Sequence, residues 1–240
     1  MNVLQLIHHR RQQGKKSFAV LIDPEKTSGE ALLAVVRTIA EAHPQLILVG
    51  GSGYQQSLDD AVTLIQQHTD IPVVLFPGNA SQFSPHANAM LFLSLISGRN
   101  PEFLIGQQVK AAPIIRAAQL ETIPTGYILV DGGIRTAVEC VSATTPLSDS
   151  DTIVATAQAG EMMGQQLIYP EAGSGALRPV APDVIRAVRN NTSIPLIVGG
   201  GLTSIPMVQT ALNAGADLIV VGNHFEKHPE DIVSFAALFA

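Results

Sequence analysis

The sequence predicts one α/β domain over residues 1–240, folded as a (β/α)8 barrel, the TIM-barrel fold. Eight short apolar runs follow one another along the chain, and runs of this kind form strands that are buried on both faces. Segments with helical character lie between nearly all of them. Strict alternation of strand and helix indicates a parallel sheet, and eight such units indicate a closed barrel. An open doubly wound sheet is the alternative, but it usually has fewer strands.

The expected elements follow in order from this alternation. Residues 2–13 are expected to form a short amphipathic helix that ends at Gly14, and Ser28 is a suitable N-cap for the next helix. The expected strands are residues 18–22, 46–49, 73–76, 90–93, 127–130, 166–171, 196–198 and 218–221. The other expected helices are residues 29–42, 55–68, 101–121, 149–163, 182–190, 204–214 and 229–239.

The interval between the third and fourth strands is shorter than the earlier ones. Only 13 residues separate Phe76 from Met90, and Pro77, Gly78 and Pro85 are among them. Once loops are allowed for, this length leaves room for little more than one helical turn. The sequence therefore predicts a barrel whose third outer helix is missing or vestigial.

Composition and charge exclude several classes of protein. Apolar residues make up 46% of the chain and charged residues 14%, which supplies ample material for one core. The net charge is −6, and no basic stripe is present, so nucleic acid is not the expected partner. The single Cys140 cannot form an internal disulfide, and neither a signal peptide nor a transmembrane segment is recognisable. We therefore expect a cytoplasmic protein.

The segment from Tyr169 to Gly175 is the first candidate for the site of chemistry. Tyr169 and Glu171 are two residues apart, so strand alternation directs both side chains to the same side. The turn that follows has exposed amides that can approach a phosphate closely. A polyol phosphate is the expected ligand, and a turn that is merely polar is the alternative. The candidate binding residues are Tyr169, Pro170, Glu171, Ala172, Gly173, Ser174 and Gly175.

Glycines also follow the last two expected strands. Gly200 and Gly201 come after the seventh strand, and Gly222 and Asn223 come after the eighth. In TIM barrels this is the common position of a phosphate site, where backbone N–H groups and a helix N-terminus hold the anion. A tight turn accounts for one glycine but not for three in a row, so we expect a phosphate to bind here.

Oxygen ligands and cations stand near the ends of other strands. Asp23 and Ser52 end adjacent expected strands, and this pair suits Mg²⁺ that keeps most of its waters and bridges a diphosphate. A helix-capping role for Asp23 is the alternative. Lys26 and Arg99 are expected on the same rim, either in contact with diphosphate oxygens or as solvated charges. No Ser-His-Asp set or strand lysine indicates covalent catalysis.

Several short motifs combine these features, in this order along the chain: Ile22-Asp23-Pro24-Glu25-Lys26, Val49-Gly50-Gly51-Ser52, Phe76-Pro77-Gly78, Leu95-Ile96-Ser97-Gly98-Arg99-Asn100-Pro101, Tyr169-x-Glu171-Ala172-Gly173-Ser174-Gly175, Val198-Gly199-Gly200-Gly201 and Val221-Gly222-Asn223. Together they resemble the geranylgeranylglyceryl phosphate synthase family over essentially the whole chain. The likeness is strongest to the second group of that family, which includes bacterial members.

The resemblance implies an Mg²⁺-dependent prenyltransferase that joins sn-glycerol 1-phosphate to geranylgeranyl diphosphate through an ether bond. By position, Asp23 and Ser52 would hold the metal, and the segment from Tyr169 to Gly175 would bind glycerol phosphate. The glycines after the last two strands would surround its phosphate. Glu171 and Tyr169 are the expected catalytic residues. The resemblance also implies an altered third helix beside the lipid chain, a homo-oligomer, and peripheral contact with membrane lipid.

Pro170 departs from the family pattern, which more often has leucine there. Proline has no N–H and is awkward inside a central strand, so it suggests that the strand has already ended. Two other functions therefore remain open. One is a different phosphate-binding barrel enzyme, such as a sugar-phosphate isomerase, and the other is a catalytically silent phospho-ligand binder disabled by Pro170.

Overall fold

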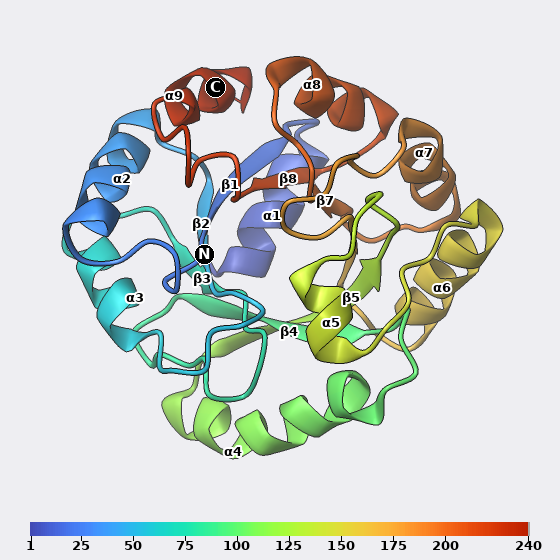
Figure 1. Ribbon diagram of the computed structural model, residues 1–240, viewed down its shortest axis with the longest axis horizontal. Coiled ribbons are helices and arrows are strands. Elements are labelled where there is room, and N and C mark those ends of the chain that lie inside the picture. Colours follow the sequence, from blue (N-terminus) through green and yellow to red (C-terminus); the bar gives the residue numbers. More distant parts are fainter. Residues whose placement is uncertain (240) are drawn as a thin grey trace.

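The computed structural model, described here for residues 1–239, has the predicted closed barrel of parallel strands (Figure 1). Each strand pairs with the next one along the chain, and the last pairs with the first. The strands are β1 (Ser17–Ile22), β2 (Leu46–Val49), β3 (Val73–Leu75), β4 (Ala89–Leu95), β5 (Glu121–Leu129), β6 (Leu167–Glu171), β7 (Ile197–Gly199) and β8 (Leu218–Val221).

Helices surround the strands, and in the view of Figure 1 the N-terminal helix α1 (Val3–Gln12) lies across the centre of the barrel. The others are α2 (Gly29–Ala42), α3 (Asp59–Gln66), α4 (Gln107–Ala118), α5 (Ala137–Ser142), α6 (Ser150–Met162), α7 (Pro182–Asn191), α8 (Ile205–Ala214) and α9 (Asp231–Ala236). A π-helical turn, η1 (Glu102–Gly106), leads into α4, and a 3₁₀ turn, η2 (Ala237–Phe239), follows α9.

The prediction of a missing third outer helix is confirmed. No helix lies between β3 and β4, and residues 76–88 form turns and bends. The two strands still pair in register, with Val74 opposite Ala89 and Leu75 opposite Met90. The short connection therefore closes the barrel but leaves its flank uncovered by a helix.

Several predicted boundaries are wrong. The helix expected at 55–68 is the shorter α3 (Asp59–Gln66), and the largest error lies between α4 and β5. The helix expected at 101–121 ends at Ala118, and β5 begins at Glu121, six residues before the predicted strand. The reason is a tertiary contact, because the Glu121 carboxylate accepts hydrogen bonds from the amides of Val3 (2.8 Å) and Leu4 (3.0 Å) at the start of α1. The short helix α5 was not predicted at all.

Helix α1 closes the amino-terminal end of the barrel. Its buried residues Val3 and Ile7 pack against inward-facing strand residues, including Leu46 and Leu167. Residues on the opposite face of the strands pack against the outer helices in a second core. The strands therefore have two buried faces, as the continuous apolar runs predicted.

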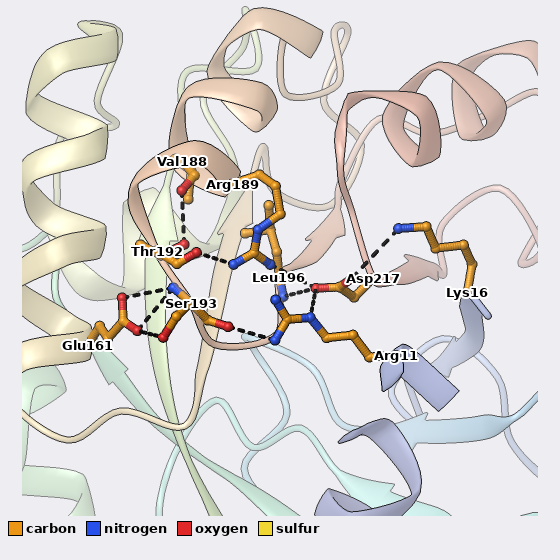
Figure 2. A network of polar contacts seen from close by, with 9 residues as sticks. All are labelled: Arg11, Lys16, Glu161, Val188, Arg189, Thr192, Ser193, Leu196 and Asp217. Carbon is orange, nitrogen blue, oxygen red and sulfur yellow. Dashed lines mark hydrogen bonds and ion pairs between the residues drawn. The ribbon is translucent and has the colours of Figure 1, made fainter. Parts of the chain in front are cut away.

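A buried aspartate joins the elements around that closed end (Figure 2). Asp217 precedes β8 and is 8% exposed. Its carboxylate contacts Arg189 of α7 at 2.9 Å, Arg11 of α1 at 3.3 Å and Lys16 at 3.7 Å. It also accepts a hydrogen bond of 2.9 Å from the Leu196 amide. Burial lowers the pKa of Arg189, and the Asp217 charge opposes that change. The Asp217 carboxylate thus forms ion pairs with three cationic groups.

We expect Asp217→Ala to lower the free energy of unfolding by about 3 kcal/mol, because it leaves a half-buried Arg189 cation and a buried amide without their partner. Urea unfolding of the two proteins measures this difference. The control is Asp183→Ala, which removes an ion pair to Arg186 from a carboxylate that is 94% exposed. It should change stability by less than about 0.5 kcal/mol. Equal effects of the two substitutions would contradict the expectation.

Candidate active site

A cavity of about 460 Å³ opens at the carboxyl-terminal ends of the strands. This is the end of the barrel at which the sequence predicted the site. Most of the predicted residues line it, from the loops after five different strands. They are Asp23, Lys26, Ser52, Tyr169, Glu171, Ser174, Gly175, Gly200, Gly201, Gly222 and Asn223.

Four predicted residues do not line this cavity. Arg99 is exposed, and its guanidinium donates to the carbonyl of Gly98 at 2.7 Å, within its own loop. The structure therefore does not bring Arg99 to the site. Ala172 and Gly173 lie outside the lining; the Ala172 amide donates to the Gly199 carbonyl at the end of β7, and the Gly173 amide lies close to Gly200. Pro170 also lies outside the lining of the cavity.

Tyr169 and Glu171 reach the cavity from the same face of β6, as strand alternation predicted. Glu171 is 5% exposed. The Tyr127 hydroxyl, from the adjacent strand β5, donates a hydrogen bond of 2.6 Å to Oε2 of Glu171. The hydroxyl of Tyr169 is fully buried and has no hydrogen-bond partner among the described residues. A buried hydroxyl without a partner, facing a polar cavity, is suited to bind a polar ligand.

Tyr127 is a functional candidate that sequence reasoning missed. Its ring packs edge-to-face on Tyr169, with ring centroids 5.4 Å apart, and Phe76 lies 5.7 Å from Tyr169. The sequence carried a signal for it, since Tyr127 stands beside Tyr169 when β5 and β6 are aligned in register. Three aromatic rings therefore form an apolar wall around the Glu171 carboxyl.

The apolar wall changes the acidity of Glu171. Burial raises the pKa of its carboxyl from 4.5 to about 7, and the nearby hydroxyls of Tyr127 and Tyr169 oppose that rise. Burial and the neighbouring Glu171 charge also raise the pKa of Tyr127 and Tyr169 well above 10.0. Glu171 therefore titrates near neutral pH, where a carboxyl group can accept a proton from a substrate hydroxyl.

Pro170 lies inside β6, within the strand expected at residues 166–171, so the suggestion that the proline marks a strand that has already ended is wrong. The residue is buried and pairs with Ile128 of β5. Toward β7, Ile168 donates to the Pro195 carbonyl and Ala172 to the Gly199 carbonyl. The missing N–H of Pro170 falls midway between these two bonds, so proline interrupts the ladder on that side only. It does not turn Tyr169 or Glu171 away from the cavity.

A group of charges crosses the mouth of the cavity. Nζ of Lys26 lies 3.0 Å from Glu226 and 3.6 Å from Asp23, and it donates to the Ser174 hydroxyl at 3.4 Å. These residues come from the loops after β1, β6 and β8. Glu226 was not predicted. The mouth therefore combines one cation with two carboxylates and a hydroxyl.

Asp23 and Ser52 line the same cavity, from adjacent loops. The Asp23 side chain is 13% exposed, its Oδ1 accepts a hydrogen bond of 3.1 Å from the Glu25 amide, and its Oδ2 lies 3.6 Å from Lys26. Among residues 1–239 no three His, Cys, Asp or Glu side chains are grouped closely enough to hold a metal. One carboxylate and one hydroxyl fit Mg²⁺ that takes its remaining ligands from water and from a phosphorylated substrate.

Backbone amides form the opposite wall. Gly200 and Gly201 have positive φ angles of 79° and 68°, which only glycine adopts easily. A side chain at Gly200 would also collide with the Gly173 amide, at 2.6 Å. Helix α8 begins just beyond, and its N-cap Ser204 makes no side-chain cap. Free amides and a helix N-terminus are the ordinary components of a phosphate site.

A second, smaller cavity of about 100 Å³ lies beside the first. It runs under the short β3–β4 connection and against α4 and α5, and its lining includes Leu91, Leu93, Phe103 and Ala111. The residues common to both cavities are Gly51, Ser52, Phe76, Tyr127 and Val138. The polar cavity thus shares a wall with an apolar groove at the flank that has no outer helix.

Comparison with known proteins identifies the relatives of this chain. The pattern of the PcrB family matches residues 9–237. The chain belongs to the PcrB family. Two relatives named geranylgeranylglyceryl phosphate synthase are similar to it along nearly its whole length. The one from Flavobacterium johnsoniae is 47% identical, over 94% of this chain and 96% of its own. The one from Spirosoma linguale is 44% identical, over 98% and 96%.

Solved structures agree with this assignment to the PcrB family. The (S)-3-O-geranylgeranylglyceryl phosphate synthase of Thermoplasma acidophilum, in complex with sn-glycerol-1-phosphate, superposes with a TM-score of 0.93 at 32% identity. The match covers 100% of this chain and 98% of that one. The tryptophan synthase α-subunit of Pyrococcus furiosus, with a TM-score of 0.58 at 15% identity, shares the fold alone. The resemblance that the motifs indicated is therefore confirmed.

The raised pKa of Glu171 makes stability depend on pH. Between about pH 4.5 and pH 7 the folded protein keeps a proton that the unfolded carboxyl has lost, so the free energy of unfolding falls as the pH rises through this window. The decline ends above the folded pKa. Glu171→Gln should remove this contribution. Urea unfolding of both proteins across the window measures the difference, and a difference that does not vary with pH would contradict the expectation.

Proposed function

We propose that this chain joins sn-glycerol 1-phosphate to geranylgeranyl diphosphate through an ether bond, with release of diphosphate. The observation that carries the proposal is that a polar cavity and an apolar groove lie side by side and share the lining residues Ser52 and Tyr127. One substrate is small and anionic, and the other has an anionic head and a long apolar tail. The names of the relatives, and the glycerol phosphate in the Thermoplasma acidophilum complex, support the same pair of substrates.

Glycerol phosphate fits the wall formed by β6, β7 and β8. Its phosphate would lie on the amides near Gly200, Gly201 and Gly222, in front of the N-terminus of α8. Its hydroxyls would then face the unpaired Tyr169 hydroxyl and the Glu171 carboxyl. Tyr169 gains a hydrogen-bond partner in this arrangement, which explains why a buried hydroxyl is left without one in the protein alone.

The prenyl donor fits the other side of the cavity. Its diphosphate would lie near Asp23, Ser52 and Lys26, and its hydrocarbon tail would lie in the groove beside Leu93 and Phe103. Asp23 and Ser52 would hold Mg²⁺, whose chemistry when bound is to neutralise the charge of the leaving diphosphate. Lys26 would exchange its contacts with Glu226 and Asp23 for contacts with diphosphate oxygens.

The reaction needs little covalent chemistry from the protein. The allylic C–O bond of the donor breaks, and its electron pair leaves with the diphosphate. A glycerol hydroxyl oxygen forms the new C–O bond, and its proton passes to Glu171. The pKa of about 7 suits this carboxyl to accept a proton at neutral pH. The rings of Phe76, Tyr127 and Tyr169 would exclude water from the allylic carbon, which otherwise competes as an acceptor.

The two alternative functions have less support. A sugar-phosphate isomerase has no use for an apolar groove beside its phosphate site. The hypothesis of a catalytically silent binder depended on Pro170 disabling the site, but Tyr169 and Glu171 still reach the cavity on either side of it.

No helix in the described part of the chain has the length and apolar character needed to cross a bilayer. The homo-oligomer, the cytoplasmic location and the peripheral contact with membrane lipid stay predictions.

The proposal is tested by incubating the purified protein with Mg²⁺, labelled geranylgeranyl diphosphate, and either sn-glycerol 1-phosphate or its 3-phosphate enantiomer. We expect an ether lipid of the correct mass from the 1-phosphate alone. Product from neither enantiomer, with glycerol phosphate still bound, would favour the silent binder. Parallel reactions with shorter and longer prenyl diphosphates would establish the chain length that the groove accepts.

Glu171→Gln should lower the turnover number by about 100-fold or more, because the amide cannot accept the proton of the attacking hydroxyl. In the unchanged protein the turnover number should rise with pH through about 7, as Glu171 loses its proton. Product formation is measured between pH 5 and 9. Calorimetry with glycerol phosphate is the control, since binding should persist in the variant. Turnover at the original rate would remove Glu171 from this role.

Asp23→Asn should raise the Mg²⁺ concentration that gives half-maximal activity by about ten-fold or more, because a neutral amide is a poor ligand for this ion. The measurement is an Mg²⁺ titration at saturating concentrations of both substrates. Asp183→Asn is the matched control, since this exposed carboxylate lies on α7 and does not line the cavity. An unchanged titration in the Asp23 variant would assign the metal to other ligands.

A further inference from the structure

Gln82 is a fully buried glutamine in the short connection between β3 and β4, and it also borders the apolar groove. Its Oε1 accepts hydrogen bonds from the amides of Gly51 (3.2 Å) and Gly78 (3.1 Å). Its Nε2 donates to the carbonyls of Gly51 and Tyr54, both at 2.6 Å. A side-chain amide has two N–H donors and two acceptor lone pairs, so every hydrogen-bonding position of Gln82 is used.

These bonds hold the backbone on both sides of Ser52. Gly51 is bound through its N–H and its carbonyl, and Tyr54 is bound two residues after Ser52. Moving this stretch would leave buried polar groups without partners, at about 1–3 kcal/mol for each group. Gln82 therefore fixes the path of the loop that carries the Ser52 hydroxyl.

The same contacts reach Asp23 through Gly51. A Cβ atom at Gly51 would lie 2.4 Å from Oδ1 of Asp23, so the carboxylate rests directly against this glycine. Gly78 approaches the Gly51 carbonyl from the other side, where a Cβ atom would lie at 2.6 Å. Packing this close between backbone segments tolerates little displacement. The position of Gly51 thus determines where the Asp23 carboxylate rests.

We propose that Gln82 is a positioning residue for the diphosphate end of the prenyl donor. It acts through the Gly51 peptide and the Tyr54 carbonyl, and it sets the relative positions of Asp23 and Ser52. The inference rests on the proposed function, because it takes the Asp23 side of the cavity as the diphosphate site. Glycerol phosphate binds the opposite wall, which Gln82 does not contact, so the two ligands respond differently to its replacement.

The test measures binding, not product formation. Calorimetry gives the Kd of geranylgeranyl thiodiphosphate, an unreactive analogue, in the presence of Mg²⁺, and the Kd of sn-glycerol 1-phosphate separately. In Gln82→Met, which keeps the length of the side chain without its amide, we expect the analogue to bind about five-fold more weakly or worse. Its Mg²⁺ dependence should shift to higher concentration, and the Kd of glycerol phosphate should stay unchanged.

A second variant and a matched control separate positioning from stability. Gln82→Glu keeps the shape of the side chain and both acceptors but loses both donors, so it should also weaken binding of the analogue. Ser57→Ala removes a hydrogen bond of 3.0 Å to the Phe83 carbonyl, which joins the same two segments outside both cavities. It should leave both Kd values unchanged.

Three outcomes would overturn the proposal. The first is an unchanged Kd of the analogue in a folded Gln82 variant. The second is an equal loss of affinity for the analogue and for glycerol phosphate. The third is failure of both Gln82 variants to fold, which would assign the residue to barrel stability. Failure of the proposed function is distinguishable from all three, because the unaltered protein would then not bind the analogue in the presence of Mg²⁺.

Discussion

The connection between β3 and β4 has too few residues to form an outer helix, and much of the active-site side of this barrel depends on that constraint. Without a helix, the flank between α3 and α4 is covered by turns, and an apolar groove remains beneath them. The same turns place Phe76 against Tyr127 and Tyr169 and carry Gln82 under the Ser52 loop. A barrel with a complete set of helices would have to bind a long hydrocarbon chain elsewhere.

The barrel interior sets the second condition for the chemistry. A carboxyl group that faces inward from β6 is surrounded by aromatic rings, and it loses the water that would keep it ionised at low pH. At the cavity mouth, Asp23 remains in contact with solvent and with Lys26. Two carboxyl groups in one site thus have different acidities because one is buried and the other is not. In the proposed reaction, this difference would separate the group that accepts a proton from the group that binds Mg²⁺.

The sequence was sufficient for the architecture because barrel strands have two buried faces, and the resulting apolar runs are hard to mistake. It also located the missing helix, since chain length alone excludes one. It did not reveal where β5 begins, because Glu121 extends the strand by binding the amides of α1, more than a hundred positions earlier in the chain. Helix α5 has only six residues, too few for a periodic pattern.

Most of the residues that line the cavity were expected there from the sequence, whereas contacts to distant backbone were not. Tyr169 and Glu171 follow from alternation along β6, and Tyr127 was within reach of the same reasoning. Arg99 carries the correct charge, but its side chain folds onto its own loop. Gln82 binds main-chain groups 31 positions away, which no local pattern encodes.

Pro170 has a mechanical consequence for the barrel. Its ring leaves one rung out of the ladder between β6 and β7, while the ladder between β6 and β5 is continuous. Strands β6 and β7 lead into the loops of Ser174 and Gly200, which both line the cavity where we propose that the phosphate binds. We expect local opening of the barrel to occur most readily between β6 and β7. The two loops could then separate slightly to admit an anion and close on it afterwards, while the other strands stay paired.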